Sequence, residues 1–188
     1  AKLHVSSSTE DADIFLVLRI FSPDMKEVVF QGALDPHTPI GQGWLRASHR
    51  KLDKKLTLPF RPYHTHDEKQ PLKPGDIYEL DIEIIPTCIV VPKGYRVVLS
   101  VRGCDYVYPG GSVGKLSNMK NEFTGNGPFL HNDPRDRPIS IYGGKNTLHL
   151  GGGRDNFVLL PIIPPRKAAP AKAKAAKPAR GATKKKRR

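Results

Sequence analysis

Cysteine is scarce in this 188-residue chain, which contains only Cys88 and Cys104. A small secreted scaffold held together by disulfides would carry more cysteines, so that class of protein is excluded. A disulfide across a sheet is the alternative, but we expect two reduced, partly buried thiols in a cytoplasmic protein.

Long apolar runs are also absent, and no stretch approaches the length that crosses a bilayer. We therefore expect a soluble protein without a membrane partner. The sequence starts at Ala1, already in strand-like sequence, with no initiator methionine and no signal-peptide pattern. We expect it to be a piece of a longer protein.

Acidic residues are missing from positions 166–188, where eleven residues are Lys or Arg. The other 20 basic residues face 18 acidic residues in positions 1–165, so most of the net charge of +13 belongs to the C-terminal segment. This Lys, Ala and Pro sequence offers no side chains for a core. It predicts a disordered basic tail over 165–188.

Flexible positive charge of this density is enough for weak, salt-sensitive and non-specific binding to nucleic acid. The tail contains no aromatic residue, so stacking on bases is excluded. The alternative is a solvated extension that attaches to any polyanion and has no evolved partner. The candidate polyanion-binding residues are Lys172, Lys174, Lys177, Arg180, Lys184, Lys185, Lys186, Arg187 and Arg188.

Alternation of apolar and polar residues predicts the strands of the body. Residues 78–84 and 95–102 each place apolar side chains on one face and charged or polar ones on the other. Residues 14–21 are apolar almost throughout, as in a strand buried on both faces. Strands with one wet face indicate an antiparallel sheet covered on one side. We predict an all-β fold over 1–164, a jelly-roll β-sandwich of the galactose-binding-like type.

The acidic side chains Glu79, Asp81 and Glu83 share one face of the first alternating strand. We expect them to form cross-strand ion pairs with Arg96 and Arg102 rather than a catalytic acid pair. The other expected elements are strands at 3–5 and 28–30, long loops at 54–74 and 109–138, and a terminal hairpin of 147–150 with 156–163.

The motifs that suggest catalysis or metal binding lack the context that this chemistry needs. Gly110–Gly114 matches the G-x-S-x-G pattern of serine hydrolases, but a turn sequence precedes it and a poor helix follows. Ser112 is therefore expected to be a loop serine. We expect His64 and His66 to point to opposite sides, which disfavours a shared metal ion. We predict no catalytic residue, metal or cofactor in this chain.

One short region combines the single tryptophan with several cationic side chains. The segment 41–53, GQGWLRASHRKLD, is rich in the aromatic and arginine side chains that carry most of the binding energy at protein interfaces. This composition favours a docking surface. The alternative is a solvated strand edge with one buried tryptophan. The domain-interface candidates are Trp44, Arg46, His49, Arg50, Tyr63 and His64.

Five segments of the chain, taken in order, point to one protein family. They are GWLRASHRKLD, RPYHTHDEKQPLKPGDIYELDIEI, PTCIVVPKGYRVVLSVRGCDY, GPFLHNDPRDRP and TLHLGGGRDNFVLLPIIP. Together they resemble the C-terminal domain of the CocE/NonD hydrolases, which include cocaine-esterase-like acyl hydrolases and X-Pro dipeptidyl-peptidases. The resemblance covers about residues 1–164, and the basic tail lies outside it.

This resemblance implies a non-catalytic jelly roll that packs against an upstream α/β-hydrolase domain of the same protein. In that family the upstream domain carries the Ser-His-Asp triad, so no catalytic residue is assigned to this segment. The parent protein is then expected to hydrolyse acyl esters or X-Pro peptides through an acyl-enzyme. The alternatives are a free-standing carbohydrate- or protein-binding sandwich and, from the tail alone, a nucleic-acid binder. A homo-oligomer is a further partner hypothesis.

Overall fold

The computed structural model describes residues 1–32, 34–110 and 123–164, and its strands form two antiparallel sheets. In the first sheet, β1 (Lys2–Ser7) lies between β5 (Tyr78–Asp81) and β7 (Asn146–Leu148). Both neighbours run antiparallel to β1, whose buried side chains include Leu3 and Val5. The strands predicted near residues 3–5 and 78–84 are thereby confirmed.

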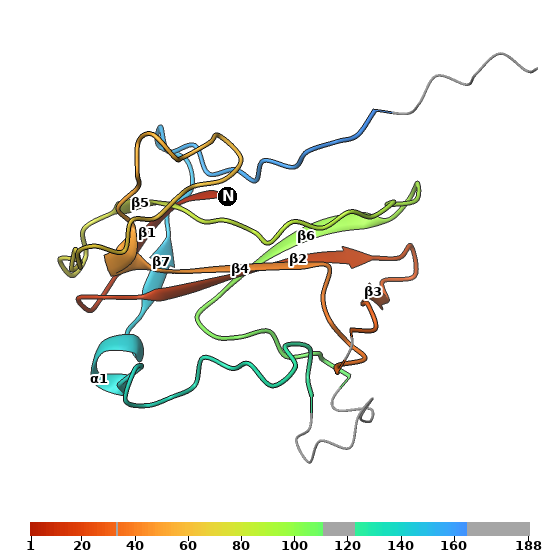
Figure 1. The fold of residues 1–188 in the computed structure, drawn as a ribbon, viewed down its shortest axis with the longest axis horizontal. Helices are drawn as coiled ribbons and strands as arrows, with labels where there is room; N and C mark the ends of the chain where they lie inside the picture. The colour runs from red at the N-terminus through yellow and green to blue at the C-terminus, as the bar shows by residue number, and fades with distance from the viewer. Residues whose placement is uncertain (33, 111–122, 165–188) are drawn as a thin grey trace, which may run out of the picture.

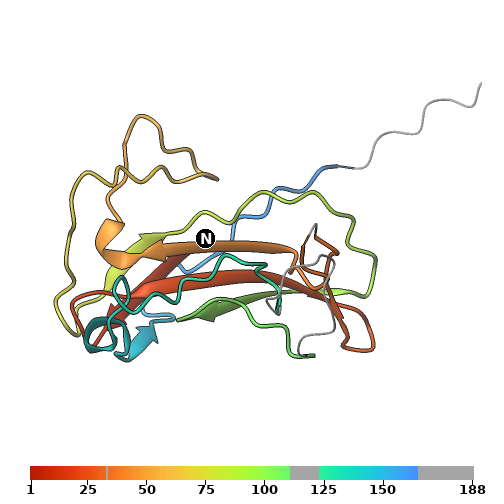
Figure 2. The same cartoon turned by 60° about the horizontal axis from the view of Figure 1, so that its bottom comes forward.

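The second sheet is built on β2 (Asp13–Phe21), the longest strand. One edge of β2 pairs with β6 (Arg96–Arg102). Along the other edge, the first part of β2 pairs with β4 (Gly41–Arg46) and its last two residues pair with the short β3 (Glu27–Val28). The two sheets lie over one another in Figures 1 and 2. This arrangement confirms the predicted all-β sandwich.

The helices of the described residues are two single turns, η1 (Ala47–His49) and α1 (Ile139–Tyr142). Residues 54–74 form no named strand or helix, as predicted for a long loop. The galactose-binding-like classification and the domain boundary at 164 remain predictions. The predicted tail and Ser112 lie outside the described residues.

Both faces of β2 are buried, which explains its almost continuous apolar sequence. Ile14 and Leu16 belong to the core between the sheets, where they pack with Leu80 and Ile82. On the opposite face, Phe15 is also buried, and its ring contacts His131 and the guanidinium of Arg137. Both belong to the long segment between β6 and α1, whose course Figure 1 shows. That segment acts as a third layer over the outer face of the second sheet.

Glycine at two inward positions of β4 lets the chain beyond β5 approach very closely. A Cβ atom on Gly43 would lie 1.9 Å from the carbonyl oxygen of Glu83, and one on Gly41 would lie 3.3 Å from the side chain of Ile84. The amide of Ile85 donates to the carbonyl of Gln42 at 2.7 Å. Backbone contact, rather than side-chain packing, therefore sets the spacing of the two layers here.

The predicted ion pairs between β5 and β6 are wrong, because these strands belong to different sheets. Glu79 and Asp81 instead contact Lys2 of the neighbouring β1, with 3.6 Å between the Lys2 Nζ and Asp81 Oδ2 atoms. The acidic face of β5 is thus neutralised within its own sheet. Arg96 and Arg102 do not take part in it.

The predicted terminal hairpin is also wrong. Phe157 forms an antiparallel bridge with Lys2 of β1. The chain after β7 therefore stays on the edge of β1 with which β7 pairs, and it does not fold back to pair with β7 itself. Between β7 and Phe157, the residues Gly151–Gly153 bulge out from β1. Their φ angles of 73°, 61° and 80° favour glycine. The side chain of Asn156 closes the bulge by accepting from the His4 amide and donating to the His149 carbonyl.

A buried carboxylate, Asp35, ties the loop before β4 to a segment about ninety residues later. It accepts backbone N–H bonds from His37, Gly125 and Gly127 at 2.7 to 3.0 Å. Three such donors satisfy an ionised carboxylate that solvent hardly reaches. Residues 123–127 are therefore fixed against the sandwich.

The two cysteines are free, and both are exposed. The expectation that they are partly buried is therefore wrong. Cys88 lies in the open stretch between β5 and β6, and Cys104 follows the end of β6, so neither side chain enters the core between the sheets.

Candidate functional site

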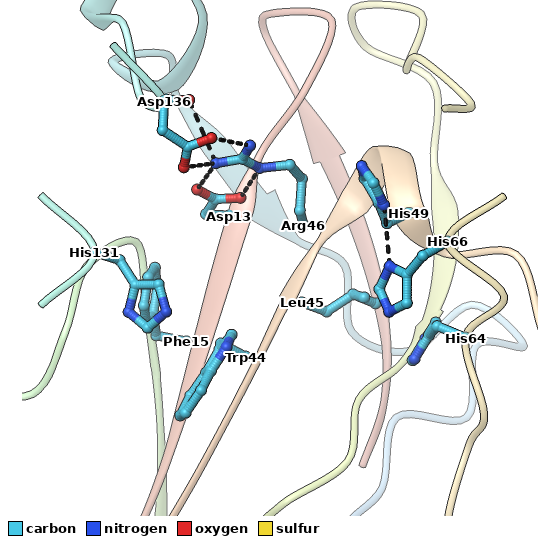
Figure 3. A pocket seen from close by; sticks show the side chains of 10 residues that line it. All are labelled: Asp13, Phe15, Trp44, Leu45, Arg46, His49, His64, His66, His131 and Asp136. Atoms are coloured by element: carbon cyan, nitrogen blue, oxygen red, sulfur yellow. Dashed lines mark hydrogen bonds and ion pairs between the residues drawn. The ribbon is translucent and has the colours of Figure 1, made fainter. Parts of the chain in front are cut away.

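A pocket of about 370 Å³ opens on the outer face of the second sheet, at the β2–β4 pair (Figure 3). It gathers four histidines, one exposed tryptophan and an ion-pair network in one place. The lining residues are Asp13, Phe15, Trp44, Leu45, Arg46, His49, His64, His66, His131 and Asp136. Four of the six predicted interface residues therefore meet here.

The strand register places the central side chains of the pocket side by side. Phe15 of β2 lies opposite Trp44 of β4, and Asp13 lies opposite Arg46. Directly opposite residues of an antiparallel pair share a face, so all four project outward together. Phe15 is buried, whereas Trp44 is 46% exposed. A large aromatic surface is thus presented on a rigid, packed support.

His131 forms the next wall, and a carboxylate holds it in place. Its backbone amide and its Nδ1 atom contact the two oxygens of Asp105 at 2.6 and 2.9 Å. Its ring lies 5.3 Å from Phe15 and 5.0 Å from Trp44, between centroids. This contact orients the ring and leaves Nε2 as the ring nitrogen that Asp105 does not engage.

Arg46 is the centre of an ion-pair network rather than a free cation. Its guanidinium binds Asp13 at 2.9 and 3.1 Å and Asp136 at 2.9 Å twice, and it stacks over the ring of Tyr142. Arg137 binds the same Asp13 at 2.8 Å. Hydrogen bonds to the two carboxylates raise the pKa of Arg46, and the Arg46 guanidinium lowers the pKa of Asp136. The network fixes the rim of the pocket.

Three histidines form the opposite wall. The Nδ1 atoms of His49 and His66 are 3.0 Å apart, and the rings of His64 and His66 are 6.0 Å apart. The expectation that His64 and His66 point to opposite sides is wrong, because residues two apart along an extended chain share a side, and the two rings do lie near each other. Burial, and then the charge of His66, lower the pKa of both His49 and His64.

The lowered pKa of His49 and of His64 favours their neutral imidazoles, which both donate and accept hydrogen bonds. One Nδ1 of the close pair must accept the proton that the other donates. Within the described ranges, no group of three or more His, Cys, Asp or Glu side chains is arranged to hold a metal ion. The wall therefore has the chemistry of a polar contact surface.

The two remaining interface candidates lie outside the pocket lining. Arg50 donates to the carbonyls of Ala47 and Gln70 and stacks over the ring of Tyr78 at 4.6 Å, so it stabilises the chain after η1. Tyr63 is exposed on the loop that precedes His64. The interface role of all six candidates remains a prediction.

Sequence reasoning missed the part of the pocket that comes from distant segments. Phe15 was expected only as a core residue, and His131, Asp105 and Asp136 stand in or beside a long loop without periodicity. The strand predicted at 14–21 was the one available signal, since successive side chains of a strand point to opposite faces and Phe15 must therefore face away from Ile14. No local pattern brings residue 131 to residue 44.

Comparison with known proteins identifies the family. A profile of the X-Pro dipeptidyl-peptidase C-terminal non-catalytic domain matches residues 1–159. The chain belongs to this family. The description as non-catalytic agrees with the expectation that the segment contains no triad of its own.

Curated relatives of this non-catalytic domain are much longer than the chain. Proteins from Mycobacterium bovis and Mycobacterium tuberculosis, both named as serine esterases, are each 27% identical over 108 residues, which are 55% of this chain and 15% of theirs. The chain therefore spans only a small part of the relatives that it matches.

Solved structures of a CocE/NonD family hydrolase from Staphylococcus aureus share the fold. One crystal structure superposes with a TM-score of 0.61 and 24% identity, covering 81% of this chain and 25% of the other. A second superposes with a TM-score of 0.56 and 26% identity, covering 70% and 23%. The sandwich thus corresponds to about a quarter of a hydrolase chain.

Among the residues that the structure describes, no helix has the length and hydrophobicity that a bilayer crossing requires. The predicted cytoplasmic location remains a prediction.

Proposed function

We propose that the chain is the accessory domain of a serine hydrolase and that its pocket face docks on the catalytic α/β-hydrolase part of the same protein. The family assignment, the relatives named as serine esterases and the CocE/NonD hydrolase fold support this proposal. The parent enzyme then cleaves acyl esters or X-Pro peptides through an acyl-enzyme. The accessory domain braces the catalytic part and forms one wall of its substrate site.

The observation that carries the proposal is the exposed indole of Trp44 on a rigid base. Trp44 rests beside buried Phe15 and the carboxylate-held ring of His131, so binding does not have to order it. Tryptophan in a preformed, partly apolar pocket is a frequent centre of binding energy. The surrounding imidazoles supply polar contacts around it. A partner surface that covers Trp44 also excludes water from the Asp105–His131 pair.

The test uses the full-length hydrolase with Trp44→Ala. We expect a loss of docking free energy on the order of 2 kcal/mol, seen as faster amide exchange of β4 and a lower kcat/KM toward ester and X-Pro amide substrates. The matched control is Phe60→Ala, because Phe60 is an exposed aromatic that does not line the pocket. If Trp44→Ala and Phe60→Ala show the same kcat/KM and the same amide exchange of β4, the pocket face is not part of the interface with the catalytic domain.

We further propose that the basic tail gives the chain weak, non-specific affinity for nucleic acid. Eleven positive charges and no acidic residue in 166–188 support this affinity. Removal of 166–188 should abolish binding to single-stranded DNA at low salt and leave hydrolase activity unchanged. Binding that survives the truncation would assign it to the sandwich instead. Self-association of the sandwich and a cytoplasmic location are retained as predictions.

A further inference from the structure

The strand β6 has an open edge. It pairs with β2 along its whole length, and within the described part of the chain no backbone hydrogen bond joins its other edge to a further strand. Val97, Val98 and Val101 are exposed along it, and it contains no proline. An exposed edge strand with a largely apolar middle invites a further strand, so proteins normally cover it or protect it with charge.

Two arginines mark the ends of this edge. Arg96 lies near the sulfur of Met25, and Arg102 lies 3.9 Å from the sulfur of Cys104. In the described residues, no ion pair joins either arginine to a carboxylate. Both project from the outer face of the sheet, since they lie opposite Phe21 and Phe15 of β2. The edge is therefore apolar in the middle and positive at both ends.

A second copy of the chain fits this edge poorly. Two β6 strands related by a two-fold axis pair antiparallel, and residues on the same face must stand opposite each other. The register that pairs all seven residues is centred on Leu99, and it sets Arg96 opposite Arg102 at both ends. Like charges directly opposite are destabilising. The next register that keeps residues of the same face opposite each other is shifted by two residues, and it avoids this clash but pairs only five residues of each strand.

We propose that the open edge of β6 takes up an extended segment of the hydrolase polypeptide from outside these 188 residues, with acidic residues opposite Arg96 and Arg102. This inference rests on the proposed function, because it places the partner strand in the catalytic part. Backbone hydrogen bonds hold the added strand, and the two ion pairs fix its register. The added strand extends the sheet whose other flank, β4, carries Trp44, so one partner can engage both flanks.

The first experiment titrates the isotopically labelled 188-residue chain with two synthetic peptides, followed by NMR. Both have seven residues with alternating Thr and Val in the middle; one has Glu at each end and the other has Lys. We expect amide shifts confined to β6 and its neighbours, with the Glu peptide bound about tenfold more tightly. The preference should reverse in the double variant Arg96→Glu with Arg102→Glu. No shifts at millimolar peptide, or equal binding of both peptides, would overturn the proposal.

The register argument has its own test. Arg102→Glu alone should let β6 pair with a second copy, because Arg96 of each copy then faces a carboxylate of the other. We expect concentration-dependent dimers of this variant by sedimentation, which neither the natural chain nor the double variant forms through β6. Dimers of the double variant, or of the natural chain through β6, would overturn the charge rule.

In the full-length hydrolase, the β6 amides should exchange more slowly than in the 188-residue chain. If they exchange equally fast while Trp44→Ala still weakens docking, the strand-addition proposal fails and the accessory role stands. If Trp44→Ala has no effect but the β6 amides are protected, the assignment of the pocket face fails instead.

Discussion

Replacing Arg46 by Met tests whether the ion-pair network holds the rim of the pocket. The Asp13 side chain is only 9% exposed and accepts three hydrogen bonds from guanidinium groups, two from Arg46 and one from Arg137. Arg46→Met keeps an apolar stem of similar length and removes two of the three. The nearly buried carboxylate then keeps a single partner.

The size of the effect follows from this accounting. Removing one member of a buried ion pair costs about 3–5 kcal/mol, because the other charge is left uncompensated. Arg137 remains in place, so we expect a loss of about 3 kcal/mol in the free energy of unfolding, at the lower end of that range. The melting temperature should fall by roughly 6–12 °C, at 2–4 °C per kcal/mol for a chain of this size.

Urea unfolding measures this loss directly, with the emission of Trp44, the single tryptophan, and circular dichroism as independent probes. The matched control is Asp136→Asn, because the Asp136 side chain is 63% exposed and its pair with Arg46 is a surface interaction worth about 1 kcal/mol or less. If Arg46→Met costs less than about 1 kcal/mol, or no more than Asp136→Asn, Arg137 alone satisfies Asp13 and our reasoning is refuted.

Three further predictions concern other parts of the sandwich. Gly43→Ala places a Cβ 1.9 Å from a facing carbonyl oxygen and should cost about 2 kcal/mol or more in urea unfolding, whereas Gly103→Ala, which meets nothing within 4 Å, should be nearly neutral. The pKa of His64 is lowered below its ordinary 6.5 by burial and by a neighbouring imidazole, so the unfolded chain binds the proton more readily. The contribution of His64 to stability is therefore complete above pH 6.5 and falls as the pH drops below that value. Thermal melts at about pH 7.5 and pH 5 measure this, and the melting temperature should fall less between them for His64→Gln than for the natural chain. An equal fall for both proteins would contradict this prediction. Because Cys88 and Cys104 are free and exposed, a thiol reagent should titrate both in the native chain, and slow or single reaction would contradict their exposure.

The strands were predictable where the local pattern is strong. Alternation along 78–84 gave β5, and the apolar run at 14–21 gave β2 with both faces covered. The pattern does not say which strands become neighbours, and this is why Arg96 and Arg102 were wrongly paired with the acids of β5. The partner of those acids, Lys2, comes from the start of the chain.

The pocket was predictable only in part, for a similar reason. The composition around Trp44 pointed to a contact surface, and four of the six named residues do line one pocket. Phe15 and His131 reach it through strand register and through a long segment that crosses the sheet, neither of which is encoded locally. His64 and His66 show a different failure, because a period of two places residues i and i+2 on the same side and the sequence was interpreted the other way.

The carboxylate of Asp35 has a consequence for how this sandwich can change. It holds the backbone at 125 and 127, and the amide of Tyr108 donates to the carbonyl of Thr124 at 2.7 Å. Both ends of the stretch between residues 110 and 123 are thereby anchored to the sandwich independently of that stretch. The positions of Tyr108 and of residues 124–127 on the sandwich are therefore set by their own hydrogen bonds. Asp35 thus acts as a staple between two parts of the chain that lie about ninety residues apart, and its loss should release the later part while the strands stay paired.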